Sequence, residues 1–138
     1  MVKIHATYTG NLGNTCTHEP SGAEIKTAAP VDNNGDGSSF SPTDLVANAL
    51  LTCKITLMGI AANTHQISIE GTTGSVEKHM VANPRRIGKL VVSIHVPQSV
   101  TKKEQQLLLA AAQTCPVLKS IHPDIEIDFT LTFNAVSE

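Results

Sequence analysis

The chain has 138 residues, of which 41% are hydrophobic, 16% charged and 3% aromatic, and its formal net charge at pH 7 is −2. This length fits a single domain spanning residues 1–138, and the composition is that of a globular chain. The lysines and arginines form no basic stripe and the few aromatic residues offer no base-stacking platform, so we expect no nucleic-acid partner.

The first elements are predicted to be short strands. In VKIHATYT, residues Val2, Ile4, Ala6 and Tyr8 alternate with polar residues and share one face, which is strand periodicity. The same alternation is unlike the apolar run of a secretory signal. GNLGN is a turn by composition, TCTHE and AEIKTA are two further short strands around PSG, and PVDNNGDGSS is a polar loop.

A long apolar helix is predicted from Ser41 to about Asn63. Ser41 is a good N-cap, Pro42 takes the first helical position, and Asp44 answers the cap as in a capping box. The helix is apolar around most of its circumference, with one stripe formed by Val46, Ala49, Leu50, Cys53, Leu57 and Ile60. A small domain has too little sheet to cover such a helix, so we expect a homodimer that buries the helices of both chains together.

The second half is predicted to contain two strands, a helix and a final strand. QISIEGTTGSVEKHM and RIGKLVVSIHVP read as strands separated by a breaker, VANP. Thr101 with Glu104 forms a capping box that opens the helix KKEQQLLLAAAQTC, and Pro116 ends it or restarts a short turn. DIEIDFTLTF alternates strictly and is half-buried. The order βββ-α-ββ-α-β favours an α+β fold over a doubly wound parallel sheet.

The three cysteines, Cys16, Cys53 and Cys115, are far apart and odd in number, unlike a secreted disulfide scaffold. No stretch reaches about 18 uninterrupted apolar residues, so we expect no membrane span. A cytoplasmic protein with reduced thiols is the expectation, and any disulfide in it would be catalytic or redox-sensing.

Two interpretations of Cys53 stay open on spacing alone. It is either a small hydrophobic core residue with a raised pKa and little reactivity, or a reactive thiol with a nearby cation or hydrogen-bond donors. Lys54 is adjacent in sequence but points about 100° away around the helix.

Cys115 lies at the end of the second helix, just before a proline. Core packing is again the alternative. The two helices should pack against each other, and this would bring Cys115 within disulfide range of Cys53. Such a pair suggests a peroxidatic and a resolving thiol.

Two short patterns resemble parts of metal sites, and neither is complete. Cys16 and His18 are two apart, but a zinc site would need two more ligands and there is no Cys-x-x-Cys. Asp32, Asn34 and Asp36 fit the start of a calcium loop, whose twelfth position is Thr43 where a glutamate is needed. We therefore expect no metal.

The only two arginines, Arg85 and Arg86, lie in NPRRIGK. They are either part of a solvated turn between strands or candidate activators, because a guanidinium beside a cysteine lowers its pKa.

Together, FSPTDLVANALLTCKITLMGIAA, PRRIG and AAQTCPVLKSI resemble the OsmC/Ohr family of thiol-dependent hydroperoxide reductases over essentially the whole chain. SPTDL with PRRIG resembles one subgroup. The resemblance implies antiparallel sheets wrapped around two central helices that carry the cysteines, and an intertwined homodimer. It also implies Cys53 as the peroxidatic and Cys115 as the resolving cysteine, an organic hydroperoxide substrate, no cofactor, and an external dithiol reductant, lipoyl-type or on a lipoylated protein.

The sequence departs from the family pattern in one pair of residues. Members of the family pair an N-terminal arginine with a glutamate after the helix-start proline. Here that position is Thr43 with Asp44 beside it, and Gly13 lies where the arginine is expected. The replacements we expect are Arg85 or Arg86, from the same chain or from a partner chain, and Asp44.

Two function classes follow. The first is a cysteine-based peroxidase acting in oxidative stress defence through a Cys53 sulfenate and a Cys53–Cys115 disulfide. The alternative is a non-catalytic dimeric binding module for an apolar ligand, with Cys53 lining the pocket.

Overall fold

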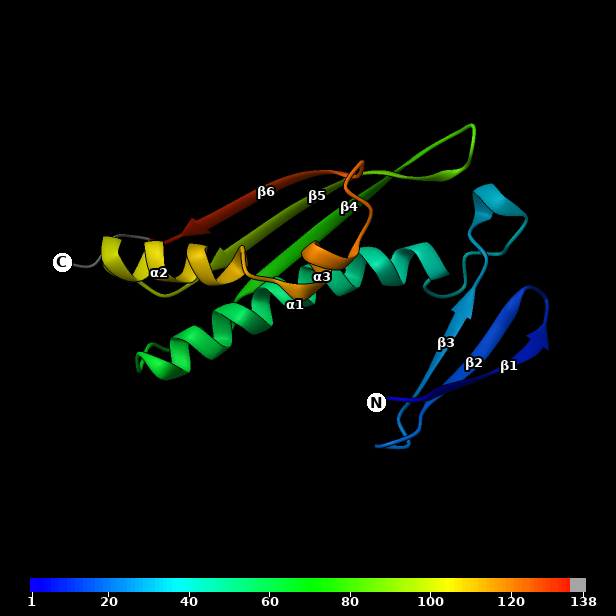
Figure 1. The fold of residues 1–138 in the computed structure, drawn as a ribbon, viewed down its shortest axis with the longest axis horizontal. Coiled ribbons are helices and arrows are strands. Elements are labelled where there is room, and N and C mark those ends of the chain that lie inside the picture. The colour runs from blue at the N-terminus through cyan, green and yellow to red at the C-terminus, as the bar shows by residue number, and fades with distance from the viewer. Residues whose placement is uncertain (135–138) are drawn as a thin grey trace. The chain divides into compact units, whose positions relative to one another are not determined.

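The computed structural model describes residues 1–134 and confirms the α+β class (Figure 1). By its internal contacts the chain divides into two units, 1–46 and 47–138, with the division inside the long helix. Each unit is described by itself, and the single-domain interpretation stays a prediction. The elements in order are β1 (Ile4–Gly10), β2 (Gly13–His18), β3 (Glu24–Ala28), the 3-10 turn η1 (Val31–Asn33), α1 (Pro42–Thr64), β4 (Thr73–Val81), β5 (Arg86–Val96), α2 (Lys102–Ala112), α3 (Pro116–Ser120) and β6 (Glu126–Phe133).

The first unit contains a three-stranded antiparallel sheet in the order β1-β2-β3. The register places Ala6 opposite Cys16 and Cys16 opposite Ile25. Ile4 and Tyr8 share the face of Ala6, because alternate residues of a strand point the same way. The side chains of Ile4, Tyr8 and Ile25 are 66%, 62% and 52% exposed. This sheet therefore has an open apolar face, on which these three side chains are mostly exposed.

Helix α1 begins as the sequence predicts. The Ser41 amide donates to the Asp44 carboxylate at 2.9 Å, and the Asp44 amide donates to the Ser41 hydroxyl at 3.1 Å. This reciprocal pair satisfies two amides that the first turn leaves without helical partners.

The buried face of α1 differs from the predicted stripe. The buried residues are Ala47, Leu50, Lys54, Met58 and Ala62. Cys53 is only half-buried and Ile60 is 57% exposed. The predicted stripe is thus one step around the helix from the face that packs on the core, and Leu50 is the residue common to both.

By length and composition, α1 is also apolar enough to cross a membrane, with a mean hydropathy of 1.7 over its most apolar window. One such helix is weak evidence, because a core helix meets the same criterion. Leu50, Met58 and Ala62 belong to the main core cluster of the second unit, so packing accounts for one face of the helix.

The second unit contains a three-stranded sheet in the order β4-β5-β6, with the helices on one face (Figure 1). β4 and β5 form an antiparallel hairpin, whereas β5 and β6 are parallel. Antiparallel pairing was expected throughout and fails for this last pair. The chain between them passes through α2 and α3, and a helical crossover returns the next strand in the same direction.

The core of this unit lies between the sheet and the helices. Leu90, Val92, Ile94 and Val96 alternate along β5 and are at most 2% exposed. They cluster with Leu50, Met58, Leu108 and Cys115. β6 shows the predicted alternation of exposed and half-buried residues.

The capping box of α2 supports a stability prediction. The Glu104 amide donates to the Thr101 hydroxyl at 3.1 Å, and the Thr101 amide donates to the Glu104 carboxylate at 2.9 Å. Thr101→Ala removes the acceptor for one N-terminal amide and is expected to lower the free energy of unfolding by about 1 kcal/mol. Urea denaturation checks this, and an unchanged midpoint would show that water replaces the cap at no cost.

Candidate active site

Cys53 and Cys115 come together in the second unit. Cys53 lies in the middle of α1, and Cys115 lies between α2 and α3. Both are free thiols, and a side-chain hydrogen bond joins them. Cys115 is fully buried, whereas Cys53 is half-buried. The predicted meeting of the two helix cysteines is present, and Cys53 is the one of the pair that solvent reaches.

A tight turn at the end of α2 positions Cys115. α2 ends at Ala112, and Pro116 begins α3 because its fixed φ suits the first helical position. Cys115 is the N-cap of α3, and its sulfur accepts a hydrogen bond from the Leu118 amide at 3.4 Å. The amide of the preceding residue, Val117, is directed at the Cys53 sulfur. The Cys-Pro turn thus presents two neighbouring backbone donors to the two sulfurs.

Burial is the main influence on the Cys53 thiol. Desolvation raises the pKa of Cys53 above its ordinary value of 9.0, and the hydrogen bond with Cys115 raises it further. The Val117 amide and the Lys54 ammonium act in the opposite direction. A thiol with a raised pKa is mostly protonated at neutral pH, and the thiolate is the reactive form. The groups that favour the thiolate therefore decide how reactive this site is.

Lys54 is the feature that the sequence interpretation missed. That interpretation assigned no role to Lys54, because adjacent residues point about 100° apart around a helix. Its side chain is only 1% exposed. Its ammonium donates to the Ala112 carbonyl at 3.2 Å and lies 4.5 Å from the centre of the Phe129 ring. Burial lowers the pKa of Lys54, and the charges of Cys115 and Cys53 oppose that shift.

The other predicted site residues have local structural partners. Arg85 and Arg86 lie at the β4–β5 turn and are exposed. The Arg86 guanidinium donates to the carbonyls of Ala82 and Pro84 at 3.2 and 2.9 Å. Neither arginine is among the groups that shift the pKa of Cys53. Asp44 serves in the α1 capping box. A role for these three in thiol activation stays a prediction.

Cys16 lies in the first unit, half-buried on β2 between Ala6 and Ile25. Across residues 1–134, no three histidine, cysteine or acidic side chains gather in a way that would hold a metal ion. The loop that resembles a calcium site instead forms turns, in which the Ser38 amide donates to the Asp36 carboxylate at 3.0 Å.

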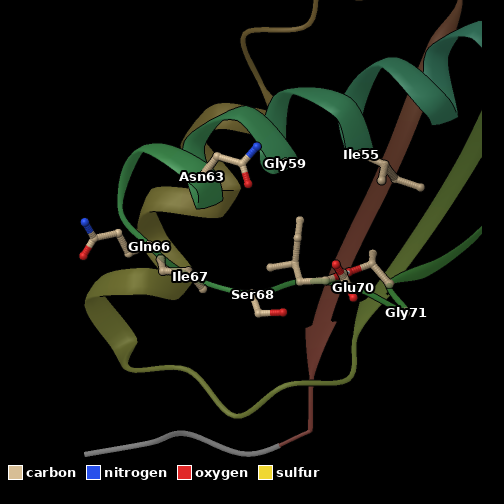
Figure 2. Close-up of a pocket in the computed structure, with 10 residues that line it drawn as sticks. Ile55, Gly59, Asn63, Gln66, Ile67, Ser68, Glu70 and Gly71 are labelled. Atoms are coloured by element: carbon tan, nitrogen blue, oxygen red, sulfur yellow. The ribbon is translucent and has the colours of Figure 1, made fainter.

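A separate groove of about 610 Å³ lies in the second unit between the C-terminal half of α1 and the segment 66–72 (Figure 2). Ile55, Gly59 and Asn63 line it from the helix, and Ser68 and Glu70 line it from the segment below. Cys53 is not among its lining residues. The groove therefore differs from the predicted binding pocket that Cys53 would line.

Comparisons with known proteins agree with this fold. A family model described as OsmC-like protein matches residues 35–130. A crystal structure from Psychrobacter arcticus 273-4, of a protein provisionally assigned as osmotic stress induced and a detoxification response protein, is 44% identical to this chain with a TM-score of 0.90. The match covers 95% of this chain and 96% of that one. The search of curated proteins found no match.

More distant solved structures show the same fold. An organic hydroperoxide resistance protein OsmC from Legionella pneumophila is 18% identical, with a TM-score of 0.75 over 96% of both chains. The organic hydroperoxide resistance protein OhrB of Bacillus subtilis is 17% identical, with a TM-score of 0.68 over 95% of this chain and 97% of that one. The family model covers well over half of the chain and the Psychrobacter protein is similar along nearly all of it, so this chain belongs to the OsmC-like protein family.

Proposed function

We propose that this chain is a thiol-dependent peroxidase that reduces organic hydroperoxides, with Cys53 as the peroxidatic and Cys115 as the resolving cysteine. The observation that carries the proposal is the hydrogen-bonded pair of reduced thiols, one reached by solvent and the other fully buried. Peroxide must meet the accessible sulfur first, and the buried one is close enough to react with the product.

The first step is attack of the Cys53 thiolate on the peroxide O–O bond. The sulfur takes one oxygen and becomes sulfenic acid, the O–O bond breaks, and the other oxygen leaves as an alkoxide that takes a proton to give the alcohol. The Val117 amide, directed at the Cys53 sulfur, supports the thiolate before attack.

The second step is condensation of the Cys53 sulfenic acid with the Cys115 thiol, which forms a disulfide and releases water. A dithiol then exchanges with this disulfide, restores both thiols and leaves as its own disulfide. A lipoyl-type dithiol, free or on a lipoylated protein, is the reductant we propose, in a cytoplasmic setting. The electrons pass from the dithiol to the peroxide, so no cofactor is needed for the balance.

Two observations support an organic over an inorganic peroxide. Ala49 and Leu57, four residues before and after Cys53 on α1, are half-buried and apolar. Several solved relatives with this fold are named organic hydroperoxide resistance proteins. An alkyl group gains from contact with such a surface, whereas hydrogen peroxide does not.

We also propose that the functional form is a homodimer. The open apolar face on β1–β3 and the exposed Ile60 on α1 are surfaces that a monomer leaves in water. Large apolar patches of this kind mark interaction sites. In a dimer, Arg85 or Arg86 of the partner subunit is a further candidate for thiolate activation. A monomeric mass in solution would contradict the dimer.

Thiol counting tests the peroxidase proposal. The reduced chain has three free thiols. One equivalent of cumene hydroperoxide is expected to consume two of them, because the proposed disulfide joins Cys53 and Cys115 and leaves the thiol of Cys16 unused. Titration before and after treatment, with mass mapping of the linked peptides, gives the result. Retention of all three thiols would contradict the proposal and favour a binding module.

A further inference from the structure

The strongest unexplained feature of the molecule is the burial of Lys54. Its side chain is 1% exposed, and it stands in the middle of the buried face of α1 between Leu50 and Met58. Burying an ammonium ion without compensation is costly, so a lysine in this position needs partners that favour its charge. A methionine or leucine would fill the same space without that cost.

The partners of the Lys54 ammonium lie around the thiol pair. One donor goes to the carbonyl of Ala112, the last residue of α2, at 3.2 Å. The last carbonyls of a helix lack amide partners and carry partial negative charge, so a cation there is favourable. The Phe129 ring, 4.5 Å away from β6, adds a cation–π contact. Ala112 is three residues before Cys115. The hydrogen bond from Lys54 therefore connects α1, which carries Cys53, to the turn that carries Cys115.

We propose that Lys54 is the positioning and activating residue of the thiol pair: it fixes the end of α2 against α1 and supplies the positive charge that favours the thiolate. This inference deepens the proposed function and rests on it for its purpose, but its test needs no peroxide. The electrostatic effects of Lys54 and the two cysteines on one another agree with this proposal: Lys54 lowers the pKa of Cys53, and the two cysteines raise the pKa of Lys54.

Among the described residues of this unit, the other charged groups named below do not offer the same arrangement. On the sheet, Glu77, Lys89, Glu126 and Asp128 alternate with the inward residues of their strands and lie on the outer face. Lys78 shares the inner face with Val76 and is half-buried. At the helices, Glu104 caps α2, while Lys102, Lys103 and Lys119 are exposed. Cys115 and Lys54 are the charged groups that act on Cys53.

The test is the pH dependence of thiol alkylation. In a Cys16→Ser background, iodoacetamide reacts with Cys53 at a rate that follows its thiolate fraction. Lys54→Met is expected to move the midpoint of the pH–rate profile upward by about one unit, so that alkylation at a fixed lower pH is about tenfold slower. The rate at the high-pH plateau reports the accessibility of the sulfur, so a change in the plateau measures the positioning role of Lys54 and a change in the midpoint measures the effect of its charge.

The matched control is Lys78→Met, which removes a half-buried lysine on the helix-facing side of β4. It is expected to leave the midpoint where it is. An unchanged midpoint in Lys54→Met would overturn the proposal, whether or not peroxide is reduced. A shifted midpoint in a protein without peroxidase activity would instead uphold Lys54 as the thiol cation and reject the proposed function.

A second measurement leaves Lys54 in place and so does not depend on how Lys54→Met folds. The carbon resonance beside the Lys54 ammonium is followed against pH in the wild type and in a Cys53→Ser, Cys115→Ser double variant. The pKa of Lys54 is expected to be lower in the double variant, because the thiolates that raise it are gone. Equal pKa values in the two proteins would contradict electrostatic coupling.

Discussion

Cys53→Ser is expected to abolish hydroperoxide reduction, with the turnover rate falling by about a thousandfold or more. The serine hydroxyl keeps the size of the thiol but does not ionise near neutral pH, and it cannot carry oxygen from a peroxide to a resolving thiol. Turnover is measured with cumene hydroperoxide and a dithiol reductant. Turnover retained by Cys53→Ser would show that Cys53 is a packing residue, the alternative that the sequence left open.

The matched partner of that experiment is Cys115→Ser. This variant keeps the nucleophile and lacks the thiol that forms the disulfide, so the Cys53 sulfenic acid should persist and react with a sulfenate-specific label. Cys16→Ser is the control and should turn over like the wild type, because the proposed cycle uses only Cys53 and Cys115, and Cys16 is not among the groups that act on the Cys53 thiol. If the label reacts with Cys115→Ser and not with Cys53→Ser, Cys53 is the peroxidatic cysteine and Cys115 the resolving one, as proposed.

Much of the fold could be predicted because local signals agree with tertiary packing. The reciprocal bonds of Ser41 with Asp44 and of Thr101 with Glu104 begin the two long helices where the sequence places them. The parallel pairing of β5 with β6 could not be read from the sequence, since strand alternation reports which face is buried and not the direction of the neighbour.

The two cysteines of the candidate site could be predicted, but the cation could not. Cys53 and Cys115 follow from their helices and from the family resemblance. Lys54 was missed because α1 is apolar almost all round, so its periodicity does not select one buried face. The spacing of Ala47, Leu50, Lys54 and Met58 is itself helical, and only the packed structure shows that this stripe and not that of Cys53 faces the core.

This comparison also changes how the reactivity of Cys53 is understood. The sequence suggested that an apolar helix without the arginine–glutamate pair of the family lacks a means to favour a thiolate. The structure places a buried ammonium one residue from Cys53 and a backbone amide at its sulfur. Because burial still raises the pKa of Cys53, these groups reduce the cost of ionisation without removing it.

The loop that leads into α1 depends on one glycine, Gly35. The segment folds back on itself, with the Gly35 amide donating to the Pro30 carbonyl at 2.9 Å and the Gly37 amide donating to the Ala29 carbonyl at 3.2 Å. A side-chain carbon at position 35 would overlap the carbonyl group of Ala29. The Ala29 amide in turn donates to the Leu12 carbonyl at 3.0 Å, so the obstructing group is backbone tied to the β1–β2 turn.

Gly35→Ala is therefore expected to lower the free energy of unfolding by about 3 kcal/mol, the upper part of the range for overpacking, because the obstacle is hydrogen-bonded backbone and not a flexible side chain. Urea denaturation measures the loss. Gly59→Ala in α1 is the matched control: beyond the neighbouring residues and the nearby backbone of the helix itself, no atom lies within 4 Å of the added carbon, and alanine in a helix is favoured over glycine by up to about 1 kcal/mol. The same substitution should thus act in opposite directions at the two positions. If Gly35→Ala were as stable as the wild type, Ala29 would have to shift without losing the bonds to Gly37 and Leu12, and the loop would not be held in the way these contacts indicate.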